Sequence, residues 1–317
     1  MSNSGLPSDP LRTRLGELDL ASPVVLAAGT AGTLDEMTGV LDVSRLGGIT
    51  SKSITREPRE GNALWRVVPL EVGMLNAIGL ANPGLDAFMS DYAPRIRSVP
   101  TNVIGSIAGN SVDDYAAVAR AFATVGPLAA VEINVSCPNV HGGTEFGADP
   151  GALRELLAAC RGELGEKPMF VKLSPIAVGT PGMVEIARTA IEAGADALCL
   201  CNTVPAMAVD VETRRPELAN VTGGLSGPAV HPIALKIVYD VYRSIARDAS
   251  VPIVGIGGVV SWREAAAFIL AGAAAVQVGT MTYADPRAAK TIVRGLGAWT
   301  RRQRAGSVRE LTGGLNA

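Results

Sequence analysis

The sequence predicts a (β/α)₈ TIM barrel of the α/β class, because short apolar runs alternate with capped amphipathic segments and eight such runs can be counted. Hydrophobic residues make up 48% of the 317 residues and charged residues 18%, which suits strands buried on both faces. The eight expected strands span residues 24–27, 49–51, 103–107, 131–135, 169–173, 197–200, 253–256 and 275–278.

Local signals mark several of the expected helices. Capping-box pairs stand at 111/114 and 261/264, and an N-cap followed by proline stands at 149/150 and 180/181. Gly194 lies where a C′ glycine should end the helix of residues 184–193. An open doubly wound sheet is the alternative, but residues 27–32 (AAGTAG) lack the spacing of its GxGxxG fingerprint.

Two segments fall outside the strand–helix repeat. Residues 11–20 resemble a hairpin with Gly16 in its turn, which we expect to plug the bottom of the barrel. Residues 55–100 separate the second and third strands, and their stretch 73–84 (GMLNAIGLANPG) is rich in turn formers, so we expect a loop over the barrel mouth. We therefore expect one domain over residues 1–317, with the barrel at about 18–300 and flexible ends.

Charge and composition narrow the class of protein. The formal net charge is −2 with no basic run, which argues against nucleic acid and anionic membranes as partners. The N-terminal stretch MSNSGLPSDPLRTR has no apolar core, and no apolar run is long enough for a membrane span. Four cysteines without a CxxC pair predict reduced thiols, so we expect a cytoplasmic protein without a structural metal.

Small and polar residues follow nearly every expected strand. In a barrel of this class the functional site lies at the carboxyl ends of the strands. The residues at those positions are Ala28, Gly29, Lys52, Ser53, Ser106, Asn134, Ser136, Cys137, Lys172, Asn202, Thr203, Gly257, Gly258, Gly279 and Thr280. The glycine-rich loops after the last two strands predict a phosphate site made of backbone N–H groups, although a tight turn would explain either pair alone.

Two lysines and four cysteines are candidates for a chemical role, and two of the cysteines, Cys199 and Cys201, alternate along the sixth expected strand. Lys52 and Lys172 each end an apolar strand, and each is a candidate Schiff-base nucleophile, a fixed cation beside an anionic ligand, or simply a surface lysine. Cys160 has core spacing on a helix, whereas Cys201 lies beside the expected site. Cys137 differs, because it follows a strand end on a proline-bounded loop that also contains His141. A Cys–His dyad is open on these residues, but nothing else indicates acyl transfer.

Seven motifs together resemble one family. They are KSITREPREGN, GMLNAIGLANPGL, INVSCPNVHGG, VKLSP, LANVTGGLSGPAVHPIALKIVYDV, PIVGIGGV and GAAAVQVGT. In this order, over residues 18 to about 286, they resemble the class 1 dihydroorotate dehydrogenases, and residues 73–84 look like the subtype whose catalytic subunit works with a separate electron-transfer subunit (class 1B).

The resemblance implies FMN in the barrel mouth with dihydroorotate against it, and Cys137 as the base that removes the C5 proton while C6 delivers hydride to the flavin. The implied flavin-binding residues are Ala28, Gly29, Lys52, Ser53, Ser106, Asn134, Lys172, Cys201, Gly227, Gly257, Gly258, Gly279 and Thr280. The implied substrate-binding residues are Lys52, Asn76, Ala77, Ile78, Gly79, Leu80, Asn134, Asn202 and Thr203.

The resemblance also implies a homodimer that forms a heterotetramer with an iron–sulfur and FAD subunit. Three positions depart from the family's usual residues: Ala28 stands for a serine, and Ser106 and Ile176 each stand for an asparagine. Three alternatives stay open: a related FMN oxidoreductase acting on another pyrimidine, a fumarate-linked class 1A enzyme, and a flavin-free lyase using Lys172 as a Schiff base. The sequence leaves the terminal electron acceptor undetermined.

Overall fold

The computed structural model describes residues 9–136, 146–175 and 179–316. Eight parallel strands close into a barrel, with each strand hydrogen-bonded to its neighbours in chain order and the last strand pairing with the first. The barrel strands are β3 (Val24–Leu26), β4 (Gly48–Thr50), β7 (Val103–Ile107), β8 (Ala130–Asn134), β9 (Met169–Leu173), β10 (Ala197–Leu200), β15 (Ile253–Ile256) and β16 (Ala273–Val278). The predicted (β/α)₈ barrel is confirmed, with strand ends within one or two residues of those expected.

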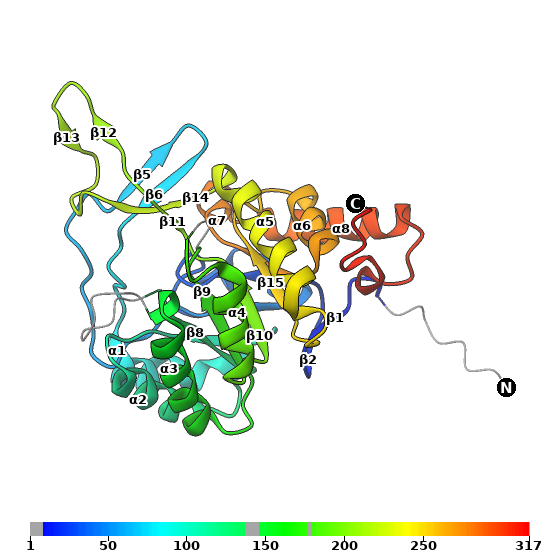
Figure 1. Cartoon of the computed structure of the whole chain (residues 1–317), viewed down its shortest axis with the longest axis horizontal. Coiled ribbons are helices and arrows are strands. Elements are labelled where there is room, and N and C mark those ends of the chain that lie inside the picture. Colours follow the sequence, from blue (N-terminus) through cyan, green and yellow to red (C-terminus); the bar gives the residue numbers. More distant parts are fainter. Residues whose placement is uncertain (1–8, 137–145, 176–178, 317) are drawn as a thin grey trace.

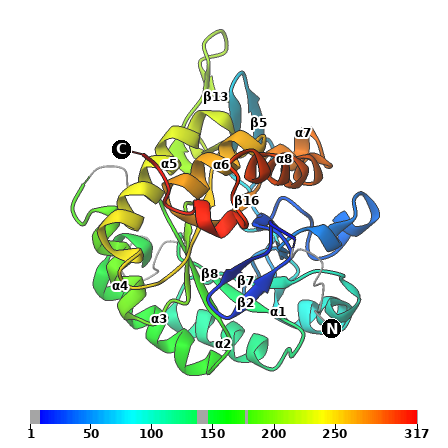
Figure 2. The same cartoon turned by 90° about the vertical axis from the view of Figure 1, so that its right-hand side faces the viewer.

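Helices surround the barrel, as Figure 2 shows in a view along it. The α-helices are α1 (Gly84–Ala87), α2 (Val112–Ala123), α3 (Pro150–Leu164), α4 (Met183–Glu192), α5 (His231–Val241), α6 (Trp262–Ala271), α7 (Met281–Ala284) and α8 (Ala288–Arg302). Shorter 3₁₀ or π turns are η1 (Glu36–Gly39), η2 (Val43–Arg45), η3 (Phe88–Tyr92), η4 (Ala93–Ser98), η5 (Phe146–Ala148), η6 (Pro228–Val230), η7 (Tyr242–Ala246) and η8 (Val308–Leu311).

The helix-start signals were mostly correct. Ser261 and Glu264 form the predicted capping box at the start of α6, and the Asp149 side chain caps α3 with Pro150 at its first position. Gly194 has φ +91° and directly follows Ala193, the C-cap residue of α4, as its C′ role requires. The expected start at Thr180 and Pro181 was wrong, because α4 begins at Met183 after an N-cap at Gly182.

The predicted N-terminal hairpin is present as β1 (Thr13–Leu15) and β2 (Leu18–Leu20), with Gly16 at φ +57° in its turn. Its leucines Leu15 and Leu20 join the inner barrel cluster that contains Val25 and Ile104. Burying these side chains removes the lower end of the barrel from water, so the hairpin is the expected plug. Figure 1 shows it on the side away from the projecting hairpins.

The long insertion after β4 is not simply a loop. Its stretch 73–84, expected as a loop, contains β6 (Gly73–Asn76), which pairs with β5 (Val67–Leu70) in an antiparallel hairpin. A second excursion after β10 supplies β11 (Val204–Ala206), β12 (Val209–Asp210), β13 (Arg215–Pro216) and β14 (Gly223–Ser226). The order β11–β14–β6–β5 joins both excursions into one sheet beside the barrel mouth, seen at the upper left of Figure 1.

Candidate active site

A cavity of about 740 Å³ opens at the carboxyl ends of the barrel strands. Its floor is formed by residues at or just after β3, β4, β8, β9, β10, β15 and β16, and β6 and β14 line its side. A pocket of this size suits a ligand or cofactor that is largely enclosed. The position agrees with the site expected for this barrel class.

Of the predicted site residues that the structure describes, all but Ser106 line this cavity. Those that line it are Ala28, Gly29, Lys52, Ser53, Asn76, Ala77, Ile78, Gly79, Leu80, Asn134, Lys172, Cys201, Asn202, Thr203, Gly227, Gly257, Gly258, Gly279 and Thr280. Cys137, like His141 and Ile176, lies outside the described residues. Ser106 is fully buried and does not line the cavity; its hydroxyl lies 2.8 Å from that of Ser53, so it contacts the site through Ser53.

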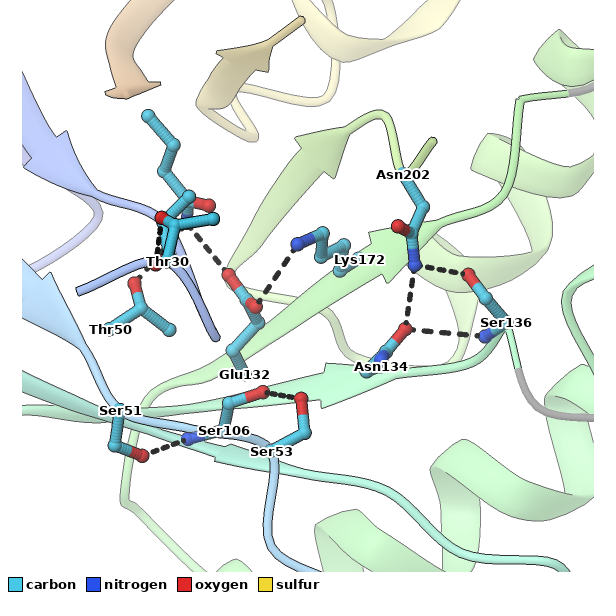
Figure 3. Close-up of polar contacts among 12 residues, drawn as sticks. Thr30, Thr50, Ser51, Ser53, Ser106, Glu132, Asn134, Ser136, Lys172 and Asn202 are labelled. Carbon is cyan, nitrogen blue, oxygen red and sulfur yellow. Dashed lines mark hydrogen bonds and ion pairs between the residues drawn. The ribbon is translucent and has the colours of Figure 1, made fainter. Parts of the chain in front are cut away.

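Asn134 and Asn202 are held by a network of side-chain hydrogen bonds (Figure 3). The Asn202 amide donates to Oδ1 of Asn134 over 3.2 Å and to Oγ of Ser136 over 2.8 Å. The Ser174 hydroxyl donates to Ser136 Oγ over 2.9 Å. Because each side chain is fixed by another, their amide groups are oriented before a ligand arrives. Ser136 was placed at a strand end by the sequence but given no binding role, and Ser174, which directly follows β9, was not predicted.

The described residues that line the cavity include three cations, Lys52, Arg59 and Lys172, and no aspartate or glutamate. Burial lowers the pKa of Lys52 below its usual value, and the charges of Lys172 and Arg66 add to this effect. Each lysine is thus held near other positive charge, which a bound anion would offset. The alternative of a surface lysine is excluded for Lys172, which is only 7% exposed.

A polar network that the sequence analysis missed lies below this cavity. Glu132 on β8 and Gln277 on β16 are almost completely buried, and Gln277 Nε2 donates to Glu132 Oε2 over 2.7 Å. Glu132 Oε1 lies 4.0 Å from Lys172 Nζ (Figure 3). The available signal was a glutamate and a glutamine inside the apolar strand sequences AVEIN and AAAVQV. Charged residues seldom occur inside a barrel unless they are paired.

Glycines with positive φ line the cavity at the loops that follow β14 and β15. Gly227 has φ +90°, Gly257 +135° and Gly258 +63°. A Cβ atom at Gly258 would lie 2.7 Å from Cβ of His231 and 2.8 Å from the carbonyl oxygen of Gly227. Consecutive residues of this kind let the backbone curve closely around a ligand, as in phosphate-binding loops.

In residues 9–136, 146–175 and 179–316, no cluster of three or more His, Cys, Asp or Glu side chains could hold a metal ion. Within those same ranges, no helix combines the length and the apolar character needed to cross a bilayer.

The fold and the site define a (β/α)₈-barrel enzyme with a cationic, glycine-lined cavity at its catalytic end. The model of the dihydroorotate dehydrogenase family matches residues 10–299. The chain belongs to the dihydroorotate dehydrogenase family.

Several curated relatives are similar over almost their whole length. A protein of Trichlorobacter lovleyi is 44% identical over 306 residues, 96% of this chain and 98% of the relative. A protein of Geotalea uraniireducens is 43% identical and one of Bacteroides thetaiotaomicron 40% identical, with the same coverage. All three are named dihydroorotate dehydrogenase B (NAD(+)), catalytic subunit. The predicted resemblance to the class 1B catalytic subunit is confirmed.

Proposed function

We propose that this chain oxidises (S)-dihydroorotate to orotate in de novo pyrimidine biosynthesis, as the cytoplasmic catalytic subunit of a class 1B enzyme. The observation that carries this proposal is the charge of the cavity. Its described lining residues include the cations Lys52, Arg59 and Lys172 and no aspartate or glutamate. Dihydroorotate and orotate are both carboxylates, and a pocket lined by lysines favours an anion.

FMN is the cofactor we propose, and the donor set fits it. The curve of Gly227, Gly257 and Gly258 suits a phosphate group, for which side chains would leave no room. Gln277 lines the cavity, and its buried Oε1 has no hydrogen-bond partner in the described residues, so it can accept from a ring N–H. When bound, the flavin would supply the hydride acceptor that no amino acid provides.

We propose that dihydroorotate is held by the substrate-binding residues that the family resemblance implies. Lys52 would face the carboxylate, and the paired amides of Asn134 and Asn202 would hydrogen-bond the pyrimidine ring. Residues 76–80 lie along the same cavity and would enclose the ring from the side of β6.

Cys137 is proposed as the base. Oxidation removes a proton from C5 and a hydride from C6 and leaves a C5=C6 double bond, so a base must take the C5 proton. Ser136, the residue before Cys137, accepts hydrogen bonds from Asn202 and Ser174 at the cavity. A general base typically contributes about 10²–10⁴-fold to the rate.

The experiment starts from the purified chain with its bound cofactor. We expect flavin absorbance that bleaches when (S)-dihydroorotate is added without oxygen. In the Cys137→Ala variant the flavin should stay bound and bleach about 10²-fold more slowly or worse. Dihydrouracil, which lacks the carboxylate, should reduce the flavin poorly. A colourless protein, or equal rates with dihydrouracil and dihydroorotate, would contradict the proposal.

The partners are a second copy of this chain and an electron-transfer subunit with an iron–sulfur cluster and FAD, together a heterotetramer. The relatives' names support the second subunit, since they denote a catalytic subunit linked to NAD(+). Leu64 and Trp65, just before β5, are 75% exposed, and Val211, between β12 and β13, is 76% exposed, which is unusual for apolar side chains without a partner. Light scattering of the isolated chain should give the mass of a dimer. Rapid turnover of this isolated chain with fumarate, and not with NAD⁺, would instead place it in the self-sufficient subtype.

A further inference from the structure

Glu132 is a carboxylate buried inside the barrel and is absent from the residues that line the cavity. It lies on β8 two residues before Asn134, and its side chain is 0% exposed. Taking a charged carboxylate out of water is costly unless an opposite charge and hydrogen bonds compensate. The residue therefore requires an explanation beyond packing.

Its neighbours divide the two carboxylate oxygens between different partners. Oε2 accepts from Gln277 Nε2 over 2.7 Å, and the same amide nitrogen lies 3.4 Å from Oγ1 of Thr50. Oε1 has no hydrogen-bond partner in the described part of the chain and lies 4.0 Å from Lys172 Nζ. Figure 3 shows the Lys172 side chain extending toward Glu132. One oxygen is thus anchored to β16, and the other faces the cation of β9.

The strand register places the residues around Glu132 on neighbouring strands of the barrel. Asn134 is the direct partner of Lys172 across β8 and β9, so Glu132 lies one inward position below that pair. Cys199 on β10 is also paired with Lys172, and burial, then the charge of Glu132, raises the pKa of its thiol well above its usual value. Cys199 therefore adds no negative charge. Among the described residues in ion-pair range of Lys172, Glu132 is the only acid.

We propose that Glu132 is the buried counter-ion of Lys172 and limits the positive charge that the cavity presents to its ligands. It is a positioning residue, because it acts through the Lys172 ammonium, with Gln277 fixing its other oxygen. The part concerning the flavin rests on the proposed function: a cation near the ring stabilises the reduced, anionic flavin, and a counter-ion behind that cation weakens the effect.

The ion pair is tested first by thermal unfolding of the whole chain. The variants are Glu132→Gln, Lys172→Met and the double variant, with Glu155→Gln on the exposed face of α3 as the control. Lys172→Met leaves the carboxylate buried and unpaired, so it should lower the unfolding temperature strongly. Adding Glu132→Gln removes that carboxylate and should restore part of the loss, whereas independent residues would give additive losses. Additive losses would overturn the proposal, whether or not the protein carries a flavin.

The second test measures the reduction equilibrium of the bound flavin against a reference dye. Glu132→Gln should favour the reduced form by about tenfold, Lys172→Met should favour the oxidised form, and the double variant should lie between the two. Glu155→Gln should match the unchanged protein. If Glu132→Gln lowers the unfolding temperature but leaves the equilibrium within twofold, Glu132 is only structural and the proposal fails. A shift toward the oxidised form would also overturn it.

Discussion

Asn202 donates a hydrogen bond to Asn134 across the barrel mouth, from the loop after β10 to the end of β8, over 3.2 Å. The strand between them, β9, carries Lys172 and leads to Ser174, which reaches the same network through Ser136. The Asn134 and Asn202 side chains are therefore held in fixed orientations relative to each other. They form a fixed polar edge beside the lysines, and this edge is the basis of the first prediction.

Replacing Asn202 with alanine removes the donor to both Asn134 and Ser136. We expect KM for dihydroorotate to rise about tenfold or more, since a lost hydrogen bond in a buried site costs about 1–3 kcal/mol. Steady-state kinetics with a dye acceptor measures this. Asn102→Ala is the control, because the Asn102 side-chain amide donates to the backbone carbonyls of Asp19 and Gly47 at the other end of the barrel. Equal effects of the two substitutions on KM would contradict the assigned role.

The lowered pKa of Lys52 predicts opposite effects on stability and on binding. The unfolded chain holds the Lys52 proton more tightly than the folded one, so burying the charged side chain destabilises the ligand-free protein at neutral pH. That cost decreases as pH rises through the lowered pKa toward 10.5. Lys52→Met should therefore raise the unfolding temperature of ligand-free protein at pH 7, by about 1–3 °C.

The affinity for orotate should change with pH in the opposite direction to the stability of the ligand-free protein. An anion favours the charged lysine, so affinity for orotate should fall as pH rises through the lowered pKa of Lys52, and Lys52→Met should be weak and independent of pH in that range. Titration calorimetry at several pH values measures both. An affinity for orotate that is unchanged by Lys52→Met would remove Lys52 from the carboxylate site.

The four cysteines should differ sharply in reactivity. Burial raises the pKa of Cys160 and of Cys201 to about 12, so almost none of either is thiolate at pH 8. We expect iodoacetamide to label native protein only at Cys137 and to leave Cys160, Cys199 and Cys201 unmodified in mass spectra. In guanidinium chloride all four should react. Labelling of Cys201 in native Cys137→Ser protein would show that the thiol beside the cavity is not shielded.

Gly258→Ala should damage the phosphate side of the cavity. The new methyl group would meet His231 and the Gly227 carbonyl at a residue with φ +63°. Positive φ and close contact together cost about 1–3 kcal/mol, and the shifted loop should retain less flavin per chain. Gly126→Ala is the matched control, because a Cβ there meets no atom within 4 Å. Unchanged flavin content in Gly258→Ala protein would argue against this loop as the phosphate site.

The barrel could be predicted from the sequence because each strand is a short apolar run and several of the following helices begin at a recognisable N-cap. Strand β15 lies where its residues indicate, and α6 begins at the capping box of Ser261 and Glu264. The residues at the floor of the cavity could be predicted in the same way, because the carboxyl ends of the parallel strands all lie at one end of the barrel. Family motifs then added individual residues such as Asn76 and Leu80, which the strand-end rule did not select.

What the sequence did not reveal depends on contacts between distant segments. β6 appeared as a loop because its turn formers suggested one, whereas its pairing of Asn76 with Gly224 joins residues 148 positions apart. Glu132 and Gln277 were counted only as strand residues, because their bond spans 145 positions and gives no local pattern. The start of α4 was misplaced because an N-cap followed by proline is a common turn signal as well.

The sheet that joins β6 to β14 has a consequence for how this enzyme can diverge or be redesigned. One strand is encoded between the second and third barrel strands and the other between the sixth and seventh, yet each supplies the other's backbone partners. If gene fragments are exchanged between relatives at a boundary within residues 77–222, β6 and β14 come from different parent proteins. The two strands that must pair would then not have evolved together. Grafts that alter substrate preference should therefore transfer both excursions as one unit and leave the barrel scaffold in place.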